Sequence, residues 1–143
     1  MPGRRARLVE PDAGTDVELT SRRGLLAGAF QAGLYVVAFG ALFLLGLVLD
    51  LVSPDAVAAA PAAVGWAALL GGGAVGAGMV ALATVEPVRR FWRRPVGRLA
   101  TVLAVYLAFF GLVATLPGPA VVAGLAFVGG RLAAHAWLVA TAP

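Results

Sequence analysis

The sequence predicts an all-α integral membrane protein with four membrane-spanning helices arranged as two hairpins. Of its 143 residues, 61% are hydrophobic and only 13% are charged, whereas a soluble domain has about 45–50% apolar and about 25% charged residues. Four apolar stretches approach or exceed the roughly 20 residues that a transmembrane helix needs. Ten of the eleven arginines lie in residues 1–23 and 86–98. These observations predict a chain that crosses a bilayer repeatedly.

The N-terminal segment, residues 1–21, is expected to be a disordered cytoplasmic tail because it is polar and has no apolar periodicity. The first span is expected at about residues 25–52, directly after Arg22 and Arg23. It is longer than the 7–15 apolar residues of a signal peptide, so we expect a span that is not cleaved. The motif Ser53–Asp55 breaks this stretch.

The remaining spans are expected at about residues 62–85, 99–116 and 120–141, so that residues 22–143 form a single transmembrane domain. The second span is rich in glycine, and Gly72-xxx-Gly76 predicts a surface where another helix approaches closely. The sequence Pro-Gly-Pro at 117–119 predicts a tight turn between the last two spans.

The distribution of arginine predicts the orientation of the chain. The connections at residues 50–61 and 117–119 contain none. The positive-inside rule then places both termini and the 86–98 segment in the cytoplasm, in a multi-pass protein of the cell membrane. Trp66 is expected near the outer membrane interface, and Trp92 and Trp137 near the inner one.

A weak internal repeat relates the two predicted hairpins. A shift of 71 residues aligns Arg22–Arg23 with Arg93–Arg94 and Tyr35 with Tyr106. Chance similarity among small apolar residues is the alternative. A real duplication would place the two hairpins around an axis along the membrane normal.

Arg131 is the most informative single residue, because it lies near the middle of the fourth span. An arginine there costs about 2.5–3.5 kcal/mol on insertion scales, so it is expected to face the bundle. His135 follows one helical turn later on the same face. A buried anion or proton site is one interpretation, and an arginine that holds helices together is the other. The residues expected at this site are Arg131, His135, Glu86, Gln31, Tyr35 and Tyr106.

The charged stretch at residues 86–98 predicts a short interfacial helix between Pro87 and Pro95. Its arginines are expected to contact anionic lipid headgroups, at about 1 kcal/mol each. Docking of an acidic partner is the alternative. The arginines concerned are Arg89, Arg90, Arg93 and Arg94.

No motif in the sequence indicates an enzyme. There is no cysteine and a single histidine, so neither a metal site nor a cofactor is expected. Nucleic acid is not an expected partner, because the arginines are placed for lipid headgroups. We therefore expect an accessory or scaffolding subunit, either a homo-oligomer or part of a membrane complex. The alternative is a small transporter or channel that uses Arg131 and His135.

Overall fold

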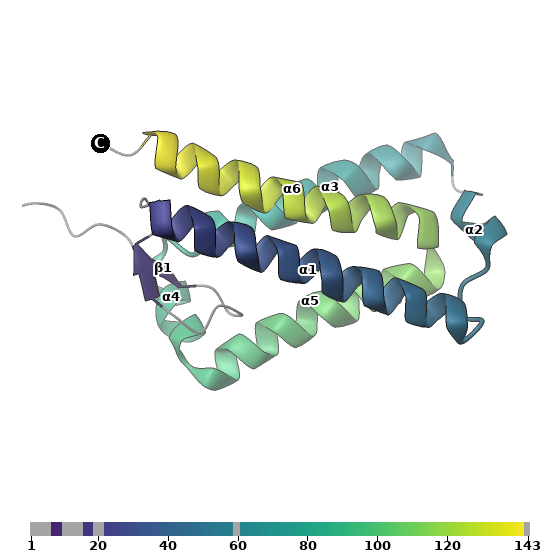
Figure 1. Cartoon of the computed structure of the whole chain (residues 1–143), viewed down its shortest axis with the longest axis horizontal. Coiled ribbons are helices and arrows are strands. Elements are labelled where there is room, and N and C mark those ends of the chain that lie inside the picture. Colours follow the sequence, from purple (N-terminus) through teal and green to yellow (C-terminus); the bar gives the residue numbers. More distant parts are fainter. Residues whose placement is uncertain (1–6, 10–15, 19–21, 59–60, 142–143) are drawn as a thin grey trace, which may run out of the picture.

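The computed structural model describes residues 7–9, 16–18, 22–58 and 61–141 (Figure 1). Four long helices dominate it, and each is long and apolar enough to cross a membrane. They are α1 (Arg22–Val48), α3 (Ala62–Leu82), α5 (Pro95–Thr115) and α6 (Pro117–Thr141). In Figure 1, α1 and α5 run in one direction and α3 and α6 in the other. The predicted helical class and the four apolar helices are therefore confirmed.

The sequence predicted a disordered tail, but the described part of this segment forms two short strands. The strands β1 (Arg7–Val9) and β2 (Asp16–Glu18) pair antiparallel, with Arg7 opposite Glu18. This two-stranded sheet lies against α4 and α1, which supplies the support that an isolated hairpin lacks. The other residues of the predicted tail, 1–6, 10–15 and 19–21, lie outside the described residues.

The end of α1 is fixed by a backbone motif. The N–H of Leu51 donates to the carbonyl of Gly46, and the N–H of Asp50 donates to that of Leu47. Asp50 has φ 54°. This is a Schellman arrangement, which places a left-handed residue just beyond the helix. The short helix α2 (Pro54–Ala58), which the sequence did not predict, follows at once.

The predicted turn at Pro117–Pro119 is wrong. These residues form the first turn of α6, and the change of direction occurs at Leu116. Proline is tolerated in a first helical turn because the N–H groups there need no acceptor within the helix. The first hydrogen bond of the helix comes from Ala120, whose N–H donates to the carbonyl of Leu116 over 2.9 Å.

Helix α6 is the centre of the bundle. It packs extensively against α3 and also contacts α1 and α5, whereas α1 and α3 make no extensive contact in the described part of the chain. The chain alternates direction as expected, but the first predicted hairpin is not a packed pair. A twofold repeat of the hairpins would relate α1 to α5 and α3 to α6, so a contact between α1 and α6 would require an equal contact between α5 and α3. The structure has the first contact but no extensive contact of the second kind, so the packing lacks this symmetry.

Glycines bring α3 and α6 into close contact. A Cβ atom built on Gly72 would collide with the carbonyl of Ala123, and one built on Gly76 would collide with that of Phe127. From the other side, a Cβ on Gly130 would collide with the carbonyl of Gly73. The prediction that Gly72 and Gly76 mark a close helix contact is confirmed, with α6 as the partner helix.

Aromatic side chains fill the space between α1, α5 and α6. The rings of Phe39 and Phe109 stack with their centroids 4.1 Å apart. Phe127 meets Tyr35 edge to face, at 5.1 Å between centroids. Outside this core the helices remain apolar, with Leu26, Leu70 and Leu107 each more than two-thirds exposed.

Candidate functional site

Arg131 is buried at the junction of α1, α3 and α6. Only 2% of its surface is exposed. The central carbon of its guanidinium lies 5.0 Å from the centroid of the Tyr35 ring and 5.7 Å from that of Phe127. Its Nη1 atom points toward the sulfur of Met79, at 3.9 Å. Both rings lie within the roughly 6 Å over which a cation and an aromatic face attract each other.

The helical repeat of α6 places His135 beside this arginine. Phe127, Arg131 and His135 follow at intervals of four residues, so they share one face of the helix. His135 is 1% exposed. Its imidazole lies directly over Gly28 of α1, where an added Cβ would collide with it. Gly28 therefore provides the space for His135. The sequence did not predict this role, because Gly28 is one of many glycines in the apolar stretches.

The matching face of α1 contributes Gln31 and Tyr35, which are 6% and 1% exposed. Within the described part of the chain, the side-chain oxygen of Gln31 has no hydrogen-bond partner. Tyr106 of α5 is half-buried, and its ring lies 5.8 Å from that of Tyr35. The structure thus brings Arg131, His135, Gln31 and Tyr35 to one interface, with Tyr106 at its edge.

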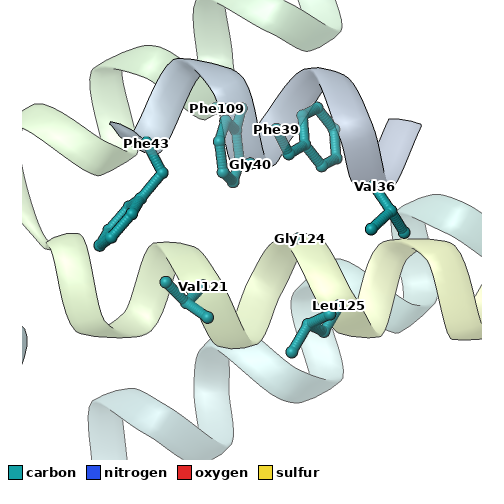
Figure 2. Close-up of a pocket in the computed structure, with 8 residues that line it drawn as sticks. All are labelled: Val36, Phe39, Gly40, Phe43, Phe109, Val121, Gly124 and Leu125. Carbon is teal, nitrogen blue, oxygen red and sulfur yellow. The ribbon is translucent and has the colours of Figure 1, made fainter. Parts of the chain in front are cut away.

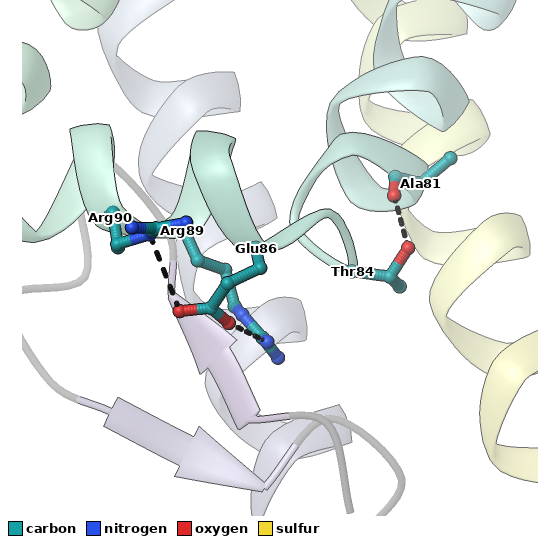
Figure 3. A network of polar contacts seen from close by, with 5 residues as sticks. All are labelled: Ala81, Thr84, Glu86, Arg89 and Arg90. Atoms are coloured by element: carbon teal, nitrogen blue, oxygen red, sulfur yellow. Dashed lines mark hydrogen bonds and ion pairs between the residues drawn. The ribbon is translucent and has the colours of Figure 1, made fainter.

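Glu86 does not belong to this cluster. It stands in the first turn of α4 (Glu86–Arg93), and half of its side-chain surface is exposed. Its carboxylate pairs with Arg89 and lies 3.7 Å from the Nε atom of Arg90 (Figure 3). The hydrogen bond from Arg89 lowers the pKa of Glu86 below its ordinary value. Glu86 was predicted to lie near His135, but its ion pairs in the described part of the chain are with the arginines three and four residues ahead.

Helix α4 has Pro87 in its first turn and ends before Pro95, as predicted, and it joins α5 at a tight corner. The indole N–H of Trp92 donates to the hydroxyl of Thr101 over 3.0 Å. Nε of Arg98 donates to the carbonyl of Trp92 over 2.7 Å. Trp92 is only 4% exposed. The buried indole of Trp92 therefore fixes the corner between α4 and α5.

Two apolar grooves open on the outside of the bundle. One, of about 270 Å³, lies between α1 and α6. Figure 2 shows the rings of Phe39 and Phe109 lying over Gly124 in this groove. The second, of about 400 Å³, lies between α3, α5 and α6. Neither groove is lined by Arg131 or His135.

Residues 4–142 match the model of a protein family described as a domain of unknown function, DUF8100. The chain belongs to this family. The match covers nearly the whole chain, so the tail, the four long helices and the cluster around Arg131 are all parts of the family domain. Neither the curated proteins nor the solved structures gave a match.

The chemistry available at the buried cluster is that of one cation, one imidazole, an amide and a phenol. No group of three metal-binding side chains occurs among the described residues. The guanidinium can bind an anion, because it carries a permanent positive charge. It can also act as a cross-link between three helices, which is the use that its contacts with Tyr35, Phe127 and Met79 support most directly.

Proposed function

We propose that the chain is a four-span integral membrane protein that acts as an accessory or scaffolding subunit. The observation that carries the membrane assignment is the apolar outer surface of all four long helices. Leu26 of α1, Leu70 of α3, Leu107 of α5 and Leu125 of α6 are each more than 60% exposed. Such a surface on every helix is typical of a protein whose solvent is lipid.

The proposed orientation has α4 and both termini in the cytoplasm. Two features support it. Helix α4 and the start of α1, which carry arginines, lie at one end of the bundle in Figure 1, as the positive-inside rule requires. Trp66 at the start of α3 and Trp137 near the end of α6 are 65% and 69% exposed, and they lie at opposite ends of the bundle, where aromatic belts occur.

Single-cysteine labelling tests this orientation, since the natural chain has no cysteine. Ser53→Cys in the α1–α2 connection and Thr141→Cys at the end of α6 both place the thiol at an exposed position. In intact cells, a membrane-impermeant maleimide should label Ser53→Cys alone. Labelling of Thr141→Cys before lysis, or extraction of the chain by alkaline carbonate, would contradict the proposal.

The accessory role is supported by the way Arg131 is used. Its guanidinium is covered by Tyr35, Phe127 and Met79 from three helices, and the two grooves on the surface are apolar. Extraction in a mild detergent should therefore yield the chain in a stoichiometric assembly, with itself or with another membrane protein. A monomer without a companion in native membranes would argue against this role.

A small transporter or channel is the second candidate. The observation in its favour is the gathering of Gln31, Arg131 and His135 within one buried interface. In proteoliposomes, this role predicts a flux of anions or protons that Arg131→Gln abolishes while the helical content is kept. The same flux from Arg131→Gln and natural protein would exclude a role for the arginine in transport.

A further inference from the structure

The second groove lies between α3 and α5, two helices that are connected by the most basic segment of the chain. Helix α3 packs on α6, and α5 also contacts α6, but α3 and α5 are not a packed pair. The space left between them, about 400 Å³, is lined by Gly71 and Val75 from α3 and by Ala104, Ala108 and Leu112 from α5. Its walls are apolar and partly made of small residues, so a flexible hydrocarbon chain can lie along it.

Topology places the charge next to this groove. Helix α4 is the connection between α3 and α5, so it necessarily stands at the end where those two helices join. The segment Glu86–Arg98 carries five arginines and one glutamate, a net charge of +4. Glu86 is already paired with Arg89 and Arg90. Arg93 and Arg94 are exposed at the junction with α5.

We infer that the groove between α3 and α5 is a binding site for one anionic phospholipid of the cytoplasmic leaflet. Its phosphate would lie at the arginines of α4, and an acyl chain would lie between α3 and α5. The inference rests on the proposed membrane location and extends it from general headgroup contact to a defined site.

The dimensions of the site agree with a lipid of one leaflet. Ala108 lies about ten residues beyond Arg98 on α5, which is about 15 Å of helix. Half of a hydrocarbon core of about 30 Å is also about 15 Å. An acyl chain that begins at the level of Arg98 therefore ends beside Ala108, within the groove.

Charge also distinguishes a lipid from a second copy of the chain. Two copies related by a twofold axis through this groove would bring their two +4 segments to the same membrane surface, side by side. Like charges at that distance repel each other. An anionic lipid brings the opposite charge to the same place, and each basic residue near an anionic surface strengthens binding by about five-fold, or about 1 kcal/mol.

Native mass spectrometry of the full chain, released from dodecyl maltoside micelles, can test the headgroup half of the site. The probes are dioleoylphosphatidylglycerol and dioleoylphosphatidylcholine. The anionic phosphatidylglycerol should bind at least about ten-fold more tightly than the phosphatidylcholine. The pair Arg93→Gln and Arg94→Gln should weaken it by about 25-fold. The matched control is Arg22→Gln with Arg23→Gln, an exposed arginine pair at the start of α1, which should change binding less than two-fold.

A tryptophan inserted in the groove tests the acyl-chain half. Ala108→Trp fills the groove, whereas Leu107→Trp changes the adjacent residue, which is 68% exposed and does not line it. Only Ala108→Trp should weaken the binding of phosphatidylglycerol, by about ten-fold or more. Ala104→Trp repeats the test one turn closer to α4 if Ala108→Trp lowers the helical content.

Three outcomes would overturn the inference. Equal binding of the two lipids would remove the headgroup site. Loss of binding in the α4 arginine variant but not in either groove variant would leave a surface contact without a groove site. A change of oligomeric state in Ala108→Trp, without a lipid preference in the natural chain, would assign the groove to a second copy. Release of the chain by alkaline carbonate would instead refute the membrane proposal itself.

Discussion

Gly76 provides the sharpest test of how the bundle is held together. It lies in the middle of α3, and a Cβ atom built on it would collide with the backbone carbonyl of Phe127 in α6. A backbone carbonyl cannot rotate away as a side chain can. Gly76→Ala must therefore push α3 and α6 apart. Gly78→Ala, two residues further along, is the matched control because its Cβ would meet nothing within 4 Å among the described residues.

The expected cost follows from the contacts that the two helices would lose. Ordinary van der Waals contact of a Cβ begins at 3.4 Å, so the helices must separate locally to admit the methyl group. A gap of about 0.5–1 Å already forfeits a quarter to a half of each dispersion contact. Overpacking a well-packed interface costs about 1–3 kcal/mol. We expect Gly76→Ala to fall in this range, and Gly78→Ala to be neutral or stabilising by up to about 1 kcal/mol.

Unfolding in mixed micelles of dodecyl maltoside and sodium dodecyl sulfate measures this difference. Circular dichroism would report the helices, and tryptophan fluorescence the loss of the buried environment of Trp92, which is 4% exposed. Gly76→Ala should unfold at a lower mole fraction of dodecyl sulfate than Gly78→Ala. Equal midpoints for the two variants would refute the argument that glycine at this interface sets the α3–α6 distance.

Four further predictions concern single side chains. Arg131→Lys should destabilise the bundle by about 1–3 kcal/mol in the same micelle assay, because an ammonium lacks the planar face that covers two rings; an unchanged midpoint would contradict the cross-linking role. Asp50→Gly should stabilise it by about 1 kcal/mol, because its φ of 54° suits glycine better. Thr101→Val should leave the buried indole N–H of Trp92 without its acceptor, which costs about 1–3 kcal/mol and should shift its fluorescence. The pKa of Glu86, measured by NMR in micelles, should lie below its ordinary value. The ion pair of Glu86 is then lost only as pH falls through that lowered pKa. In Arg89→Gln the pKa of Glu86 should rise, because the hydrogen bond that is the main cause of its depression is absent.

The extents of the long helices were predictable because apolar length and proline set them. Pro61 precedes α3, Pro87 lies in the first turn of α4, and Pro95 begins α5. Proline fixes φ and lacks an N–H, so it suits the start of a helix whatever surrounds it. The turn at residues 117–119 was misread for the same reason. Two prolines in three residues suggested a break, although both lie in the first turn of α6, where neither disrupts a hydrogen bond.

Helix pairing was not predictable, because the helices are apolar around most of their circumference. Periodicity identifies a buried face only when the other face is polar. Glycines occur on several faces of α3: Gly72 and Gly76 contact α6, whereas Gly65 and Gly71 meet nothing within 4 Å in the described part of the chain. The position of Arg131 within an apolar stretch correctly predicted that its side chain is buried in the bundle. The same reasoning could not predict that Glu86 pairs with Arg89 of its own helix.

The need to cover Arg131 explains why α6 is the central helix. A guanidinium at mid-membrane depth is costly unless other groups surround it. Helix α1 supplies Tyr35 on one side of the guanidinium, and α3 supplies Met79 on another. Both helices therefore pack against α6 around Arg131. Helix α5 meets α6 through apolar residues such as Phe109, whose ring lies against Gly124. Helix α5 makes no extensive contact with α3, and the second groove opens between these two helices, which α4 connects.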